Sequence, residues 1–170
     1  MELSPMPKFF DRYIKQVAET NVVVALEKSL EAFENFEEVT FKQLDGKRYA
    51  PGKWTIKEVL RHIIDTERIM AYRALRFARN DKTEIPGFDE NFFNENADGE
   101  KMTFEDLHQE FVLNRKSNII LFRNFNEQVL ERSGVCNGIE ITVKALGLTM
   151  AGHQKHHFNV VKERYLPIIQ

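Results

Sequence analysis

Residues 142–165 read TVKALGLTMAGHQKHHFNVVKERY, and this stretch decides the fold. Positions separated by alternating steps of three and four residues lie on one face of an α-helix. In this stretch those positions are Val143, Leu146, Met150, His153, His157, Val160 and Arg164. The pattern therefore predicts a helix over 142–165 whose inner face points into a helical bundle and contains two consecutive histidines.

Three earlier stretches show the same periodicity and predict helices over 22–36, 55–80 and 103–125. The first has Asn21 as its N-cap. The second begins with Thr55-Ile56-Lys57-Glu58, a capping box in which the hydroxyl and the carboxylate bind free backbone amides. None of the five prolines falls inside the four stretches, as long unkinked helices require. The predicted inner faces of these three helices contain Val23, Leu26, Leu30 and Phe33; Val59, Ile63, Met70, Leu75 and Phe77; and Phe104, Leu107, Phe111, Ile119 and Phe122.

The segment 81–102 between the second and third helices has poor periodicity. An extended chain of this length can cross a neighbouring helix, so a crossover and a simple up-down-up-down order are both compatible with it. Further on, Asn137-Gly138 lies between short apolar arms, which predicts a two-residue β-hairpin over 135–141. We therefore predict an all-α four-helix bundle with a long connection between helices two and three and a small hairpin before helix four.

The composition fits one compact domain over 1–170, with a leader over 1–20. The chain is 42% hydrophobic and has a formal net charge of −2, which argues against nucleic-acid binding as its main work. No stretch approaches the ~20 apolar residues that cross a membrane, so no membrane partner is expected. Cys136 is the one cysteine, so no intramolecular disulfide can form and the expected compartment is the cytoplasm.

The two histidines of the fourth helix are candidate metal ligands. His153 and His157 are four residues apart, so both imidazoles can reach one ion. Burying two imidazoles side by side costs free energy unless their nitrogens find partners, and a divalent cation would be one. Hydrogen bonds to backbone or water at a helix surface are the competing interpretation. Gly152 leaves room for the close approach of a neighbouring helix or a ligand.

His62 in the second helix is the third candidate ligand. It lies at the border of the apolar stripe, where it can point into a crevice of the bundle. Three histidines from two helices leave a coordination position open to water or substrate, which is typical of catalytic metal sites. Asp65 could orient an imidazole or act on bound water, although a solvated surface carboxylate is an equally good interpretation.

Other polar residues give weaker indications. Arg115 and Asn118 approach the inner side of the third helix and could line a polar pocket opposite the metal, which makes Arg115 a weak catalytic candidate. A small error in helix phase would place both in solvent. The chain has no G-x-S-x-G elbow, P-loop, G-x-G-x-x-G or H-E-x-x-H motif. A charged face of the second helix is expected to consist of Glu67, Arg68, Arg73, Arg76 and Arg79. One of these arginines could reach the pocket.

Several motifs together resemble those of the DinB-like (DinB/YfiT) superfamily. They are YAPGKWTIKEVLRHIIDTER at 49–68, YRALRFAR at 72–79, PGFDE at 86–90, AGHQKHH at 151–157 and ERYL at 163–166. The resemblance covers the chain from about Val22 onward. It implies a four-helix bundle of the DinB/YfiT type in which one histidine of helix two and two of helix four hold a divalent metal. On this sequence those ligands are His62, His153 and His157.

The resemblance also implies a metal-dependent enzyme. Characterised relatives include transferases and isomerases that use low-molecular-weight thiols, and others are described as metal-dependent hydrolases. The leading expectation is a thiol-dependent transferase with Zn²⁺ or Ni²⁺, a small-molecule substrate and a homodimeric assembly. The alternatives are a metal-dependent hydrolase, or a non-catalytic dimeric interaction module that uses Phe88, Phe92 and Phe93 of the long loop.

Overall fold

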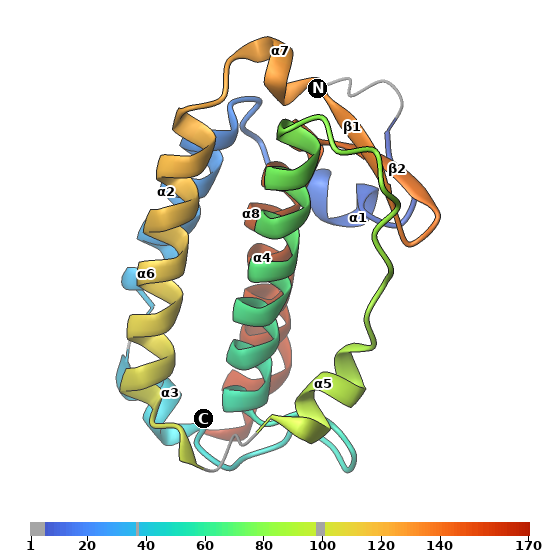
Figure 1. The fold of residues 1–170 in the computed structure, drawn as a ribbon. Helices are drawn as coiled ribbons and strands as arrows, with labels where there is room; N and C mark the ends of the chain where they lie inside the picture. The colour runs from blue at the N-terminus through green and yellow to red at the C-terminus, as the bar shows by residue number, and fades with distance from the viewer. Residues whose placement is uncertain (1–5, 37, 98–100) are drawn as a thin grey trace.

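The computed structural model describes residues 6–36, 38–97 and 101–170, and a bundle of four long helices dominates it (Figure 1). The predicted all-α bundle with a small hairpin is confirmed. The long helices are α2 (Val22–Glu34), α4 (Ile56–Ala78), α6 (Phe104–Arg123) and α8 (Val143–Val160). The shorter elements are α1 (Asp11–Ile14), α3 (Glu38–Gln43), α5 (Glu90–Asn96), α7 (Glu127–Leu130), β1 (Ser133–Cys136), β2 (Ile139–Thr142), a π-helix (Val161–Tyr165) and a 3₁₀-helix (Leu166–Ile168).

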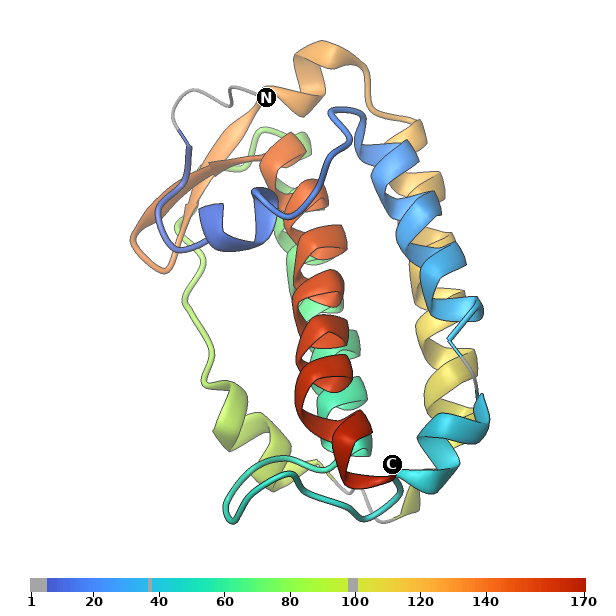
Figure 2. The ribbon, with the colours of Figure 1, turned by 180° about the vertical axis from the view of Figure 1, so that it is seen from behind.

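The long connection between α4 and α6 is a crossover. In Figures 1 and 2, α4 and α6 run in the same direction, and the chain returns along the outside of the bundle through α5. Helix α8 packs against α4 and α2, and α6 packs against the same two helices. The simple up-down-up-down order is therefore not the one adopted. The crossover covers the side of α4 and α8 on which the histidines lie.

The predicted helix starts are confirmed by their hydrogen bonds. Oδ1 of Asn21 accepts a hydrogen bond from the backbone N–H of Val24 at 3.1 Å. The Thr55 hydroxyl accepts one from the N–H of Glu58, whose carboxylate accepts one from the N–H of Thr55. A second capping box, between Thr103 and Asp106, was not predicted. These caps fix where α2, α4 and α6 begin, and α4 in turn carries His62 and Arg73.

The predicted inner faces are mostly correct, because all five positions in the third helix and most in the first two are buried. Leu75 is 38% exposed, however, because Ala74 and Phe77 take the core positions at that end of α4. Val23 is only half-buried, because Val22 faces the core instead. Among the described residues, no helix has both the length and the apolar character that crossing a membrane requires.

The end of the fourth helix differs from the prediction. Val160 is only half-buried and Arg164 is exposed, whereas Val161 and Tyr165 are buried. A strict 3.5-residue spacing drifts from the real helical period by ~20° per heptad, and the π-turn at 161–165 rotates the face further. The Tyr165 hydroxyl donates a hydrogen bond to the carbonyl of Trp54 at 2.6 Å, which ties this end of the chain to the entry of α4.

The hairpin has the turn predicted for Asn-Gly. Asn137 and Gly138 both have positive φ, 51° and 71°, as a two-residue turn between right-twisted strands requires. The strands pair antiparallel, with Cys136 opposite Ile139 and Ser133 opposite Thr142. The N–H of Asn137 also donates to the carbonyl of Ile85 at 2.9 Å. The hairpin thereby anchors the start of the crossover beside the upper end of α4.

Residues 6–20 are not only a leader, because they contain α1, which packs on α8. The contact depends on Gly152, where a built Cβ would lie 2.6 Å from the carbonyl carbon of Tyr13 and closer still to its oxygen. The expectation that Gly152 permits close approach is correct, and the neighbour is this short helix. Its position places the Tyr13 ring against His153, with ring centroids 5.0 Å apart.

Substitution Gly152→Ala should therefore destabilise the fold by ~1 to 3 kcal/mol, because the added methyl group meets rigid backbone of the α1 segment. Chemical denaturation of the purified variant measures this change. Ala151→Gly in the same turn is a control for backbone flexibility, which is expected to cost ~1 kcal/mol. A Gly152→Ala protein as stable as the wild type would show that α1 does not need this close approach.

Candidate metal centre

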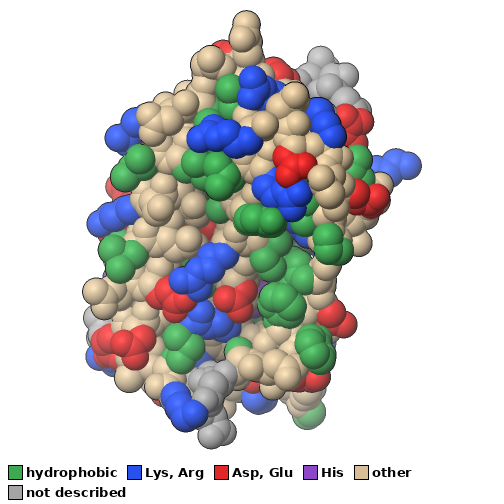
Figure 3. Space-filling view, viewed as in Figure 1, with side chains coloured by type: hydrophobic (Ala, Val, Ile, Leu, Met, Phe, Trp, Pro, Cys, Tyr) green, Lys and Arg blue, Asp and Glu red, His purple; other side chains and the backbone are tan. Residues whose placement is uncertain are grey.

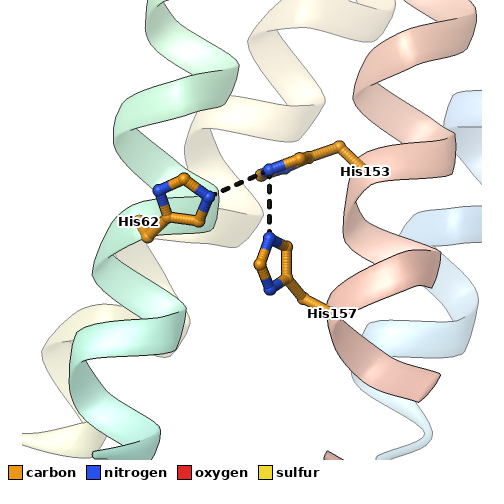
Figure 4. Close-up of side chains that lie close together, drawn as sticks. All are labelled: His62, His153 and His157. Atoms are coloured by element: carbon orange, nitrogen blue, oxygen red, sulfur yellow. Dashed lines mark hydrogen bonds between the residues drawn. The ribbon is translucent and has the colours of Figure 1, made fainter. Parts of the chain in front are cut away.

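Three imidazoles from two helices lie close together (Figure 4). His62 comes from α4, and His153 and His157 come from successive turns of α8. Nε2 of His153 lies 3.0 Å from Nε2 of His62 and 3.1 Å from Nε2 of His157. His153 is buried, with 4% of its surface exposed, and the other two are partly buried. The structure thus brings together the three histidines that the sequence singled out.

Hydrogen bonds alone satisfy this arrangement poorly. A neutral imidazole has one N–H and one lone pair, so Nε2 of His153 can either donate or accept. It faces two other Nε2 atoms and cannot form a well-aligned hydrogen bond with both. Three lone pairs can instead point at one cation. Two nitrogens bound at ~2.05 Å to one ion are ~2.9 to 3.4 Å apart at angles between 90° and tetrahedral, so the two Nε2 pairs that include His153 have the spacing of ligands of one divalent metal. All three ligand atoms lie within 4.8 Å of one another.

The pKa values of the three imidazoles also suit ligands. Burial lowers the pKa of His62 to about 4 and that of His157 to about 2, and burial together with the neighbouring histidines holds the pKa of His153 well below 6.5. Desolvation disfavours the protonated form in each case. At neutral pH the three rings are therefore uncharged, which is the state that binds a metal.

The same shifts predict that the metal-free chain loses stability as the pH falls below 6.5. Unfolded imidazoles take up protons near pH 6.5, whereas folded His62 and His157 take them up only near 4 and 2, so acid favours the unfolded state. Each such histidine should cost ~2 kcal/mol between pH 7 and pH 5. Urea unfolding of chelator-treated protein at pH 7 and pH 5 measures the loss. Equal stability at the two pH values would contradict these pKa values.

A cavity of about 160 Å³ adjoins the cluster and extends along α4. Figure 3 shows little histidine surface on the face that it draws, in keeping with the burial of the rings. None of the described residues that line the cavity belongs to α2 or α6, so it faces the crossover and not the bundle interior. A larger cavity of about 550 Å³, near Arg48 and Arg61, has no histidine in its described lining. The lining residues of the smaller cavity are Phe9, Phe10, Arg12, Tyr13, Trp54, His62, Thr66, Met70, Arg73, Gly87, Phe88, Glu90, Asn137, Thr149, His153 and His157.

The position of the cavity corrects the expected orientation of the fourth helix. The histidine face of α8 does not point to the centre of the bundle, because it meets α4 on one side and Tyr13 of α1 on the other. The neighbouring Gln154 faces α2 instead, where its side chain donates to the carbonyl of Ser29 at 2.6 Å. The α1 segment supplies the second wall, and no helix was predicted there.

The two weak catalytic candidates do not line this cavity. Asp65 is half-buried 3.6 Å from Arg61, and burial raises the pKa of its carboxyl group. Arg115 is fully buried and binds Glu67 through Nε at 2.7 Å and Nη2 at 2.8 Å. Asn118 donates to the same carboxylate at 3.0 Å. Glu67 was expected on a charged surface, but it is 2% exposed, because Arg115 and Asn118 of α6 satisfy it.

Several lining residues were not assigned to the site from the sequence. The centroid of the Trp54 ring lies 4.9 Å from that of His62. Burial lowers the pKa of His62, and the charge of Glu90 at the start of α5 acts in the opposite direction and raises it. Of the arginines expected on the charged helix face, Arg73 is the one that reaches the cavity. Each of the three motifs at 49–68, 72–79 and 86–90 contains one of these residues, namely Trp54, Arg73 and Glu90. The motifs therefore indicated the right segments of the chain but not the role of each residue.

The fold and the cluster define a helical-bundle protein with a three-histidine candidate metal centre. Residues 25–161 match the model of the DinB superfamily, and the chain belongs to this family. The solved structure of YfiT from Bacillus subtilis, described as a probable metal-dependent hydrolase with an unusual four-helix bundle topology, has 19% sequence identity and a TM-score of 0.68. The match covers 99% of this chain and 93% of that chain, and at this identity it shows the fold alone. A search of curated proteins found no match.

Proposed function

We propose that this chain is a metal-dependent enzyme in which His62, His153 and His157 hold one divalent ion, zinc or nickel. The observation that carries the proposal is the convergence of three Nε2 atoms beside a cavity. A bound ion would supply Lewis acidity and lower the pKa of a thiol or water in its open coordination position. Membership of the DinB superfamily and the description of YfiT support metal dependence.

The surrounding residues have separate roles in this proposal. The rings of Trp54 and Tyr13 pack against His62 and His153 at 4.9 Å and 5.0 Å and hold the imidazoles in position. Phe10 is 3% exposed and helps to exclude water from the same side. Glu90 is the one carboxylate among the described lining residues, and we assign it the proton released by the incoming nucleophile.

Thiol transfer to a small electrophile is the reaction that we favour. A free thiol has a pKa near ~8.5, so a modest lowering ionises it at neutral pH without a buried general base. The described lining contains no buried carboxylate, because Glu90 is exposed. Hydrolysis is the second candidate, and the description of YfiT as a probable metal-dependent hydrolase favours it.

Thiol dependence separates the two reactions. Protein loaded with Zn²⁺ or Ni²⁺ should consume 1-chloro-2,4-dinitrobenzene only when a thiol such as cysteine is added, and EDTA should stop the reaction. Cleavage of p-nitrophenyl acetate without any thiol would favour hydrolysis. Metal-loaded protein that catalyses neither reaction across a panel of thiols and esters would favour the non-catalytic module.

The phenylalanines assigned to that module lie on and before α5. Phe92 and Phe93 are 60% and 41% exposed, whereas Phe88 is half-buried and lines the histidine cavity. Phe88 and Phe93 also contact each other, with ring centroids 5.1 Å apart. A homodimer through this segment stays a prediction, and light scattering of the wild type and of Phe92→Ser tests it.

A further inference from the structure

Arg73 is a buried arginine that has no carboxylate partner among the described residues. It is 3% exposed and lines the cavity beside the histidines. Nη2 donates to the carbonyl oxygen of Pro86 at 3.0 Å, and Nη1 has only a 3.8 Å contact with the sulfur of Met70. Nε is buried and has no hydrogen-bond partner. Most of the five N–H donors of this guanidinium are therefore unused.

The other two buried arginines of the described chain are paired with carboxylates. Arg61 binds Glu110 through both Nη atoms, at 2.9 Å and 2.6 Å. Arg115 binds Glu67 through Nε and Nη2. A buried charge without a counter-ion is costly, so proteins normally pair it. Arg73 departs from this pattern at a cavity, where a ligand can reach it.

A second polar group lies between Arg73 and the histidines. Thr66 is 4% exposed and lines the same cavity, and its hydroxyl has no hydrogen-bond partner. His62, Thr66 and Arg73 are separated by steps of four and seven residues, which place them along one face of α4. Eleven residues of helix rise ~16 Å, and the long arginine side chain shortens that span.

The charges around the cavity favour an anion. Buried Arg73 and exposed Arg12 line it, and the one carboxylate of the described lining, that of Glu90, is exposed and its charge acts on His62. A divalent ion at the histidines would add two further positive charges. The planar fork of an arginine matches a carboxylate through two parallel hydrogen bonds.

We propose that the cavity takes an elongated small molecule whose carboxylate binds Arg73, whose middle contacts the Thr66 hydroxyl, and whose other end reaches the three histidines. This inference rests on the proposed function for the reacting end of the ligand. The carboxylate subsite rests on the unused donors of buried Arg73 and needs no metal. The carboxylate belongs either to the thiol or to the electrophile, and both would use the same subsite.

A matched pair of thiols tests the subsite in the metal-loaded chain. Calorimetry with Zn²⁺-loaded protein should show that 6-mercaptohexanoate binds at least about tenfold more tightly than 6-mercaptohexanol, because a charged hydrogen-bonded pair replaces a neutral group. The preference should disappear in Arg73→Met and remain in Arg79→Met, which removes an exposed arginine from the end of the same helix. Equal affinities in the wild type, or a preference that survives in Arg73→Met, would overturn the proposal.

A metal-independent titration keeps the two proposals distinguishable. In metal-free protein, hexanoate should shift the Nε–H NMR signal of Arg73, assigned by its loss in Arg73→Lys, and hexanol should not. If the chain takes up no metal but hexanoate shifts the signal, the proposed function fails and the subsite stands. If metal binds and neither the thiol pair nor hexanoate shows a carboxylate preference, the subsite fails and the proposed function stands. The wild-type measurements decide the matter even if Arg73→Met does not fold.

Two substrates determine the source of the carboxylate. If it belongs to the thiol, turnover with 6-mercaptohexanoate should have a KM at least about tenfold lower than turnover with 6-mercaptohexanol for the same neutral electrophile. If it belongs to the electrophile, 4-chloro-3-nitrobenzoate should show the same advantage over its methyl ester with a neutral thiol. No advantage in either series would contradict the subsite.

Discussion

Substitution His153→Ala should lower the affinity of the chain for divalent metal by more than about a hundredfold and abolish turnover. His153 is the central ring of the cluster, since its Nε2 lies within 3.1 Å of Nε2 in both His62 and His157. Losing only an outer hydrogen-bond partner of a metal ligand costs ~10 to 100-fold in affinity, so losing a ligand should cost more. Competition with a chromophoric chelator measures the affinity.

His156→Ala is the matched control, because it removes a neighbouring histidine that is not part of the cluster. That variant should keep its metal and its activity. If the site is catalytic, the metal-free His153→Ala variant should have a melting temperature close to that of metal-free wild type. If the metal is structural instead, removing it from the wild type should lower the melting temperature by a large amount. Unchanged metal affinity in His153→Ala would contradict the assignment of this ligand.

Substitution Glu67→Gln should destabilise the protein by ~3 kcal/mol, because it leaves the guanidinium of Arg115 buried without its counter-ion. Arg115 and Glu67 are 0% and 2% exposed, and the carboxylate also accepts a hydrogen bond from Asn118. The remaining acceptors of Arg115 are the Ser29 hydroxyl and the Leu26 carbonyl. For a chain of this size the melting temperature should fall by ~6 to 12 °C.

The exposed pair of Glu27 and Arg123 provides the control for the loss of charge. Their side chains are 48% and 61% exposed at an N–O distance of 3.0 Å, so Glu27→Gln should change the stability much less. The double variant Glu67→Gln, Arg115→Met should recover part of the loss, because it removes the uncompensated charge. A Glu67→Gln protein with wild-type stability would show that the buried pair does not help to hold α4 against α6.

Local signals in the sequence predicted much of the fold. The capping box at Thr55 and Glu58, the Asn137-Gly138 turn and the periodicity of α6 are properties of neighbouring residues, and the structure confirms each of them. The burial of Glu67 depends on the partner that α6 brings to it across 48 positions of the chain, and a single helix pattern does not contain that information. The burial of Glu67 and Arg73 on α4 was therefore missed.

The candidate site was predicted only in part for the same reason. Helical spacing placed His153 and His157 together and put His62 at the border of an apolar stripe, and the motif resemblance named the same three histidines as ligands. Tyr13 and Glu90 form walls of the cavity and lie in two short helices, α1 and α5. These helices have too few residues for a helical pattern to be detected in the sequence. The PGFDE motif marked the segment of Glu90, but the segment of Tyr13 had no such signal.

X-ray diffraction from crystals of protein purified without added metal, recorded above and below the zinc and nickel absorption edges, tests the central claim most directly. The proposal predicts one anomalous peak ~2.0 to 2.1 Å from Nε2 of His62, His153 and His157, with a further coordination position occupied by a small ligand. Well-ordered imidazoles at these positions with no anomalous peak, in crystals grown with and without Zn²⁺ or Ni²⁺, would contradict it.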